Sequence, residues 1–334
     1  MAEALTEAEH TVVPLAVGPD GCWLGADVGG AALSGSLDEL PQTGTAVLES
    51  LDALSGAPID VLFPLVHGTW GEDGSLQGLC EMLDVPFVGA GVMTSAVAMD
   101  KHLTKVVLAG SGIPVVEWDT IRREDFEADA RSCLGGSAPL GMPLFVKPSV
   151  GGSSVGVVKV LQRDDLEGAV QQALQFDDAV LVERAIEGRE LECSVLGYRE
   201  LEASRIGEIV PGAEFYDYAD KYLNDTAGLH IPAELDGEIE TRMRGMAVEA
   251  FAAIGGWGMA RVDFLLEPGG AMYINEINTL PGFTSISMYP KLWEATGISM
   301  PELVDRLVQI AIDRHTDRGR LDQGIRDWLT RLGG

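Results

Sequence analysis

The stretch that most constrains the fold is residues 259–288, MARVDFLLEPGGAMYINEINTLPGFTSISM. Two apolar-rich runs flank the turn Pro268-Gly269-Gly270, which is the pattern of two strands joined in a hairpin. Side chains alternate between the two faces of a strand, so Arg261 and Asp263 share one face of the first strand. We therefore predict a β-hairpin whose first strand carries a guanidinium next to a carboxylate.

The second strand of this hairpin carries Glu276 and Asn278 on one face. If the two polar faces coincide, three oxygen donors lie beside Arg261, and Mg²⁺ takes such oxygens as ligands next to substrate phosphates. A nucleotide site is one interpretation, and a hairpin with one solvated polar face is the other. The following loop, residues 278–287, favours the first, because its free backbone N–H groups and hydroxyls can hold a carboxylate or an oxyanion.

The 334-residue chain is strongly acidic, with 52 Asp and Glu against 23 Lys and Arg. This balance argues against nucleic acids and anionic membranes as partners, because both require clustered positive charge. No stretch has the apolar length of a membrane span and the N-terminus lacks the pattern of a signal peptide, so we expect a cytoplasmic protein. The four cysteines, Cys22, Cys80, Cys133 and Cys193, have no paired spacing and indicate neither a disulfide framework nor a zinc site.

Strands and helices alternate up to residue 98, which predicts a parallel α/β domain over residues 1–98. In this domain the apolar run 61–66 is typical of a buried parallel strand. Beyond it the pattern is that of antiparallel sheet with helices on one side, so we predict two α+β subdomains, residues 99–185 and 186–334.

A glycine-rich loop, residues 150–156, lies between two predicted strands and follows Lys147. Its glycines let backbone N–H groups approach phosphate oxygens, while Ser153 and Ser154 add donors and Lys147 adds a positive charge. The loop is not a Walker motif, and a plain hairpin turn is the alternative interpretation.

Three further segments could contribute to a ligand site. The loop 67–74, which contains His67, follows the apolar run at the end of the sheet where α/β proteins bind ligands. Glu183 and Glu190 flank a strand end that could offer backbone groups to a base and a carboxylate to a ribose. The loop 215–227 is longer than most connections, which is typical of a functional lid or of disorder.

Taken together, these motifs resemble the D-alanine:D-alanine ligases of the ATP-grasp superfamily over residues 10–312. The matching segments are residues 67–74, 147–149, 152–156, 216–218, 221–222, 261–263 and 276–284. The resemblance implies an ATP-grasp fold, in which the N-terminal α/β domain is followed in the sequence by two α+β subdomains that bind ATP between them. It also implies a homodimer that uses ATP and two Mg²⁺ or Mn²⁺ ions to ligate two D-alanines, through an acyl phosphate, for peptidoglycan synthesis in the bacterial cell wall.

The resemblance further implies roles for individual residues. ATP would bind at Lys101, Lys147, Ser154, Glu183, Glu190 and Lys221. The metal ions would be held by Asp263, Glu276 and Asn278. Arg261 and the N–H of Gly282 would stabilise the oxyanion, and Ser153 and Tyr222 would belong to a network at the first-alanine site. The remaining substrate contacts would come from His67, Ser287 and Met288, the last two at the carboxylate of the second alanine.

The loop 215–227 would then close over the site and keep water from the acyl phosphate. In related ligases that use D-lactate this loop differs and Tyr222 is absent. Its presence here with Lys221 predicts that D-alanine is a far better second substrate than D-lactate.

One feature of the family is absent from the sequence, namely an N-terminal loop of the form G-G-x-S-x-E-H-x-V-S, whose Glu anchors the ammonium of the first alanine. We therefore expect the N-terminal domain to be incomplete by about one βα unit, with weak stability and weak ligase activity. The alternative function is a nucleotide-binding relative that lacks catalysis.

Overall fold

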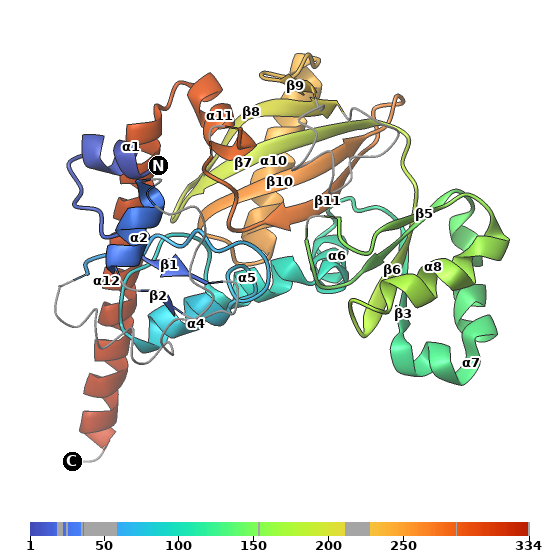
Figure 1. The fold of residues 1–334 in the computed structure, drawn as a ribbon, viewed down its shortest axis with the longest axis horizontal. Helices are drawn as coiled ribbons and strands as arrows, with labels where there is room; N and C mark the ends of the chain where they lie inside the picture. The colour runs from blue at the N-terminus through green and yellow to red at the C-terminus, as the bar shows by residue number, and fades with distance from the viewer. Residues whose placement is uncertain are drawn as a thin grey trace.

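The computed structural model describes residues 1–18, 23–24, 26–34, 36, 59–152, 154–210, 228–284 and 286–332 (Figure 1). The strands of these residues are β1 (Ala16–Val17), β2 (Trp23–Leu24), β3 (Trp118–Arg122), β4 (Leu144–Pro148), β5 (Val158–Val160), β6 (Ala179–Arg184), β7 (Arg189–Gly197), β8 (Leu201–Val210), β9 (Gly228–His230), β10 (Gly258–Leu266) and β11 (Met272–Asn278). The helices are α1 (Ala2–Glu7), α2 (Ala26–Leu33), α4 (Ser75–Met82), α5 (Val92–Met99), α6 (Lys101–Gly110), α7 (Arg123–Gly136), α8 (Leu166–Ala173), α10 (Gly237–Ala253), α11 (Met288–Thr296) and α12 (Met300–Leu332). No helix in the described ranges combines the length and the apolar character needed to cross a membrane.

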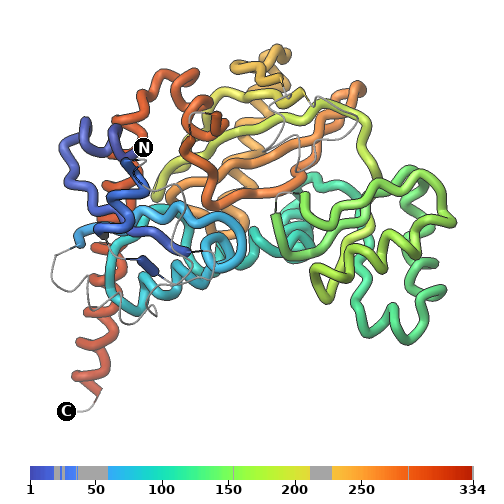
Figure 2. Tube along the Cα trace, in the orientation of Figure 1, coloured from blue at the N-terminus to red at the C-terminus, as the bar shows by residue number. Residues whose placement is uncertain are grey.

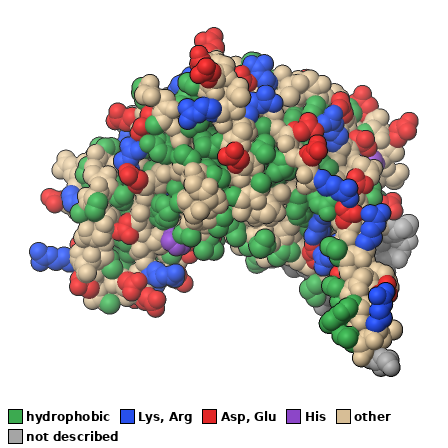
Figure 3. Space-filling model, turned by 180° about the vertical axis from the view of Figure 1, so that it is seen from behind, with side chains coloured by type: hydrophobic (Ala, Val, Ile, Leu, Met, Phe, Trp, Pro, Cys, Tyr) green, Lys and Arg blue, Asp and Glu red, His purple; other side chains and the backbone are tan. Residues whose placement is uncertain are grey.

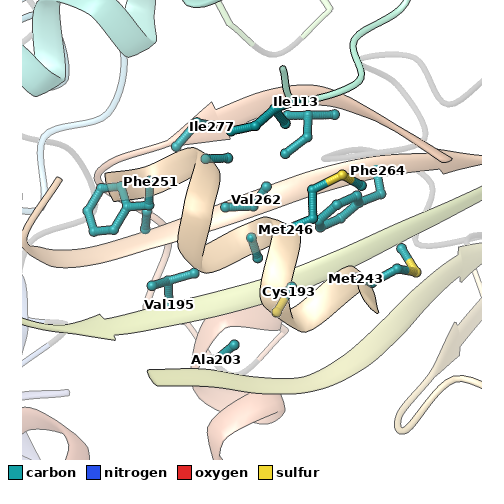
Figure 4. Packing of buried hydrophobic residues seen from close by; sticks show 14 of the residues in the cluster. Ile113, Cys193, Val195, Ala203, Met243, Met246, Phe251, Val262, Phe264 and Ile277 are labelled. Atoms are coloured by element: carbon teal, nitrogen blue, oxygen red, sulfur yellow. The ribbon is translucent and has the colours of Figure 1, made fainter. Parts of the chain in front are cut away.

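The largest sheet has five antiparallel strands in the order β11-β10-β7-β8-β9. Alternate residues of these strands, such as Val262 and Phe264, point to one side and pack against α10 (Figure 4). Met243, Met246 and Phe251 of α10 complete this core. Because side chains alternate, the charged residues between the core residues lie on the opposite face of the sheet.

A second sheet has four antiparallel strands in the order β3-β6-β4-β5. Its core face, which includes Val146 and Val182, packs against α7 and α8. Lys147 and Glu183 follow these residues by one position, so they lie on the other face of the sheet. The two antiparallel sheets confirm the α+β prediction for this part of the chain, whereas the domain boundaries at residues 98 and 185 stay predictions.

The parallel N-terminal sheet was a wrong prediction for the described residues. The described residues up to residue 98 contain one isolated parallel bridge, Leu62 to Phe87, and the short antiparallel pair β1–β2. The sequence predicts strands over residues 10–17 and 61–66, but these contain Pro14 and Pro64, and proline lacks the N–H that a continuous ladder needs. The apolar residues of this region still reach a core, because Val61 and Phe63 pack on the cluster formed by α1, α11 and α12.

Several elements differ from the sequence prediction in extent. The sequence predicts one helix over residues 95–109, but the structure has two, α5 and α6. Asp100 between them has an extended backbone, and its carboxylate accepts a hydrogen bond from the N–H of Leu103, which caps α6. The sequence prediction missed β3, β9, α7 and α11. The sequence also predicts a last helix over residues 300–316, and in the structure this helix, α12, continues to Leu332.

Helix α12 has two parts in different environments. Leu303, Val304, Leu307 and Ala311 are buried beside α1 and α11. The C-terminal part runs past the other elements and projects away from them (Figures 1 and 2). The first part therefore packs into the core, whereas residues 318–332 are all exposed.

The close contact between the start of β10 and the N-terminal region depends on Gly258. This residue has a φ of +84°, and a Cβ added to it would lie 2.4 Å from the carbonyl oxygen of Gly89. We predict that Gly258→Ala lowers the free energy of unfolding by about 2 kcal/mol or more. The alanine side chain would clash with Gly89, and alanine is also unfavourable at a positive φ. Chemical denaturation measures the change. Gly269→Ala is the matched control, since a Cβ at Gly269 meets open space, and equal stability of the two variants would contradict the prediction.

Candidate active site

The hairpin predicted from the sequence is confirmed as β10 and β11, which pair antiparallel. Arg261 lies opposite Asn278, and Asp263 lies opposite Glu276. Residues directly opposite each other project from the same face of a sheet, so the two polar faces coincide as predicted. The hairpin therefore brings a guanidinium, two carboxylates and an amide together on the face opposite the α10 core.

Arg261 is held between two carboxylates. Its Nε lies 2.7 Å from Oδ1 of Asp263 and 3.1 Å from Oε2 of Glu192, and its Nη2 donates to Oδ2 of Asp263 at 2.7 Å. Burial alone lowers the pKa of Arg261, but the charges of Asp263 and Glu192 more than offset it, so the pKa lies well above its ordinary value. The guanidinium is thus a fixed positive charge with a set orientation.

Glu192 was missed in the sequence analysis. It lies opposite Asp263 in the pairing of β10 with β7 and is almost fully buried. Glu190, a predicted nucleotide ligand, precedes it by two positions and therefore shares its face of β7. The alternation of acidic and apolar residues from Glu190 to Cys193 could have indicated a strand with an acidic face. Only the pairing of β7 with β10 shows that Glu192 lies next to Asp263.

Lys147 and Glu183, two residues to which the resemblance gives a role in ATP binding, contact each other on the four-stranded sheet. The Nζ of Lys147 lies 2.7 Å from Oε2 of Glu183, and both residues are buried. Lys105, which had no predicted role, lies 3.2 Å from Oε1 of the same carboxylate. Burial alone raises the pKa of Glu183, but the two lysines outweigh it and lower the pKa below its ordinary value.

Lys105 is buried in a polar setting built by α6 and β3. Its Nζ donates to the carbonyl of Val116 at 3.1 Å and lies 5.6 Å from the centre of the Trp118 ring. Burial lowers its pKa to about 8, against the opposing effect of Glu183. Its place one helical turn after Lys101 was the sequence signal that could have indicated a role.

Lys101 connects α6 to the glycine-rich loop. Its backbone N–H donates to the carbonyl of Ser149 at 2.9 Å, and its Nζ donates to the carbonyl of Gly151. Burial lowers the pKa of Lys101, while the charge of Glu276 on the hairpin opposes the shift. Lys101 is therefore close enough to both sheets to sense the charges of each, and the predicted phosphate loop lies beside it.

His67, Gly282 and Ser287 come together from distant parts of the sequence. A Cβ at Gly282 would lie 4.0 Å from Nε2 of His67 and 2.6 Å from Oγ of Ser287, so only glycine fits there without displacement. The Oγ of Ser287 accepts a hydrogen bond from the N–H of Thr284 at 3.0 Å. The carboxylate of Glu72, 3.9 Å from Nδ1 of His67, raises the pKa of that histidine above its ordinary value.

Of the remaining predicted residues, the structure describes Ser287, Met288 and Ser154 but not the others. Ser287 is the N-cap of α11, whereas the side chain of Met288 is buried against Ile209 and Leu292, so only its backbone N–H is available to a ligand. Ser154 lies in a turn within the glycine-rich loop, with a φ of +59°. Ser153, Tyr222 and Lys221, and with them the predicted lid, lie outside the described residues.

The donor set of the hairpin fits a magnesium site. Among the described residues, no group of three or more His, Cys, Asp or Glu side chains is placed to hold a metal ion. Mg²⁺ does not require such a group, because it is commonly held by one or two carboxylates together with substrate phosphates. Asp263 and Glu276 supply the carboxylates, and the side-chain oxygen of Asn278, which also accepts a hydrogen bond from the N–H of Leu280 at 3.0 Å, supplies the amide.

The sequence matches two family models, "D-ala D-ala ligase N-terminus" over residues 1–90 and "D-ala D-ala ligase C-terminus" over residues 107–309. A D-alanine--D-alanine ligase of Solibacter usitatus is 51% identical over 78% of this chain and 79% of its own length. A D-alanine--D-alanine ligase of Mycobacterium bovis is 44% identical over 93% of this chain and 89% of its own length. Among solved structures, the D-alanine-D-alanine ligase of Coxiella burnetii superposes with a TM-score of 0.72 at 41% identity, covering 83% of this chain and 74% of that one.

The N-terminal match corrects the expectation of an incomplete first domain. Because the family model of that domain matches residues 1–90, it gives no support to a missing βα unit. The expectation rested on one absent motif, whereas the match rests on the pattern of the whole region. The matches to both parts, together with the identities above, lead to one conclusion: the chain belongs to the D-alanine–D-alanine ligase family.

Proposed function

We propose that this protein uses ATP to join two D-alanines into D-alanyl-D-alanine, the dipeptide used in peptidoglycan precursors. Membership of the ligase family supports the reaction, and the polar face of the β10–β11 hairpin is the observation that carries the assignment to this site. That face carries the guanidinium of Arg261 and three side chains with oxygen ligands for a metal ion. Lys101 lies close enough for the charge of Glu276 to affect its pKa. Phosphoryl transfer requires this combination of positioned charges.

The phosphates of ATP would lie between the two sheets, beside the glycine-rich loop. Lys147 and Lys101 would neutralise phosphate charge, and the turn after Gly152 would offer backbone N–H groups. Glu183 holds Lys147 in place at 2.7 Å, and Lys105 supports Glu183 from the other side. Lys105 is thus a positioning residue for the nucleotide site rather than a direct ligand.

Magnesium, when bound at Asp263, Glu276 and Asn278, would neutralise the charge that develops on the transferred phosphoryl group. The carboxylate of the first D-alanine attacks the γ-phosphorus of ATP, which gives an acyl phosphate and ADP. The amine of the second D-alanine then attacks the acyl carbon. The tetrahedral intermediate expels inorganic phosphate and loses a proton from nitrogen to give the dipeptide.

The residues near the hairpin suit the second half of this reaction. Arg261 and the N–H of Gly282 would stabilise the oxyanion of the tetrahedral intermediate. Ser287 and the N-terminus of α11 would hold the carboxylate of the second D-alanine, since helix N-termini favour negative charge. His67, with its raised pKa, would add a positive charge next to that carboxylate.

The assay of this function is phosphate release from ATP with and without D-alanine, with the product identified by mass spectrometry. The proposal requires D-alanine-dependent release of one phosphate per dipeptide. ATP binding without D-alanine-dependent release would instead support the catalytically silent relative.

We predict that Glu276→Gln reduces ligation to background while the fold is retained, because an amide lacks the charge that helps hold Mg²⁺. Phosphate release measures activity, and circular dichroism measures folding. Glu249→Gln, an exposed residue of α10, is the matched control and should keep full activity. Near-normal turnover of a folded Glu276→Gln protein would contradict the metal assignment.

Arg261→Ala should lower kcat by roughly 10²-fold or more if the guanidinium stabilises the oxyanion, as loss of one oxyanion donor does elsewhere. This change also leaves Asp263 and Glu192 without their buried partner and so lowers stability. Arg261→Lys keeps a positive charge but loses the planar fork, and it should still lose most of kcat. An effect confined to KM in Arg261→Lys would place Arg261 in substrate binding instead.

The raised pKa of His67 can be tested directly by NMR titration, with His67→Gln used to assign its resonance. In the native protein the midpoint should lie above 6.5, because Glu72 favours the protonated ring. Glu72→Gln should move the midpoint to lower pH, since the favourable interaction is lost while desolvation remains. An unchanged midpoint would show that Glu72 does not control this histidine, and Glu249→Gln again serves as the control.

A further inference from the structure

Arg314 of α12 lies beyond residue 309, where the family match ends, and it contacts three separate parts of the chain. Its guanidinium carbon lies 4.2 Å from the centre of the Trp257 ring and 5.3 Å from the centre of the Phe87 ring. Its Nη2 forms an ion pair with the carboxylate of Glu81 on α4. The side chain is 17% exposed, so these contacts are made largely away from water, where aromatic rings attract a cation more strongly.

The partners of Arg314 come from two regions of the molecule that meet near the candidate site. Glu81 and Phe87 belong to the N-terminal region, whereas Trp257 directly precedes β10 of the hairpin. The rings of Phe87 and Trp257 are themselves 5.6 Å apart, and a Cβ added to Gly91 would lie 3.1 Å from Nε1 of Trp257. Arg314 therefore joins the N-terminal region to the start of β10 where the two are already closely packed.

The same N-terminal region carries the loop 67–74, which contains His67. Before this loop, Leu62 forms a parallel bridge with Phe87 through backbone hydrogen bonds of 2.8 and 2.9 Å. After the loop, α4 begins, and its buried Gln77 donates from Nε2 to the carbonyl of Gly71 at 2.7 Å. The N-terminal partners of Arg314 are therefore attached to both ends of this loop.

We propose that Arg314 is a positioning residue for D-alanine, because it holds the loop 67–74 in place beside Gly282. The inference rests on the proposed function, which puts the second D-alanine next to His67, Gly282 and Ser287. The position of His67 relative to Gly282 depends on how the N-terminal region packs on the start of β10, and Arg314 contacts both sides of that packing.

The contacts of Arg314 are separate from those assigned to ATP. Lys147 and Glu183 lie on the four-stranded sheet, whereas the contacts of Arg314 lie in the N-terminal region and directly before β10. A change at Arg314 should therefore act on the use of D-alanine more than on the binding of ATP. A misplacement of about 1 Å at a group that positions a substrate can cost as much as roughly 100-fold in rate.

The test compares the native full-length chain with Arg314→Met, Arg314→Lys and Arg326→Met, by phosphate release at varied D-alanine and varied ATP. Arg314→Met removes the charge and the planar group, so it should raise the KM for D-alanine by about tenfold or more while the KM for ATP stays native. Arg314→Lys keeps a positive charge next to Glu81 but loses the flat face that stacks on the rings, so its KM for D-alanine should rise less.

Arg326→Met is the matched control, since it removes the same charge from the exposed end of α12, which projects away from the other elements (Figure 3). Both of its KM values should stay native. A native KM for D-alanine in a folded Arg314→Met or Arg314→Lys protein overturns the proposal, and so do equal rises in the KM for D-alanine and for ATP. Circular dichroism shows whether each variant is folded.

The ring resonances of His67 give a readout that does not depend on catalysis. They should move in the NMR spectrum of Arg314→Met and keep their native positions in Arg326→Met, because only the first change releases the loop. If the native chain releases no phosphate in response to D-alanine, the proposed function fails. Unmoved His67 resonances in a folded Arg314→Met protein would instead overturn the role of Arg314, whatever the activity.

Discussion

The register of β10 against β11 is the constraint on which the candidate site depends. It sets Asp263 opposite Glu276 and Arg261 opposite Asn278, and the neighbouring strand adds Glu192 beside Arg261. A shift of one residue would turn every one of these polar side chains into the α10 core and bring Val262 and Ile277 to the site. The hydrophobic core therefore fixes the register, and the register brings the polar side chains of the candidate site together.

A strongly acidic chain that handles ATP must supply positive charge locally. Lys105 and Lys147 both contact the carboxylate of Glu183, and these three side chains are buried, while Lys101 lies close enough for its pKa to respond to their charges. Each lysine would be costly to bury alone, but the shared carboxylate offsets part of that cost. An anionic ligand would offset the rest of this cost, so we expect the three lysines to favour nucleotide binding.

The sequence was sufficient to predict the β10–β11 hairpin, because strand alternation and local turn chemistry are short-range properties. It could not show that Lys105 or Glu192 joins the site, since both contacts depend on how distant elements pack. The parallel sheet failed for a local reason, as Pro14 and Pro64 interrupt the runs that composition alone would make strands. The predicted end of the last helix at residue 316 was too early, because Gly319 and Gly324 lower the helix propensity of the residues that follow.

The junction between α5 and α6 connects the glycine-rich loop to the core below the β10–β11 hairpin. At this break the side chain of Asp100 accepts a hydrogen bond from the hydroxyl of Ser149, and the backbone of Lys101 is bonded to the carbonyl of the same serine. The far end of α6 packs through Leu108 into the core beneath β10 and β11. Helix α6 therefore gives a direct path of contacts from the glycine-rich loop to the hairpin, so we expect a ligand bound at the loop to affect the position of the hairpin.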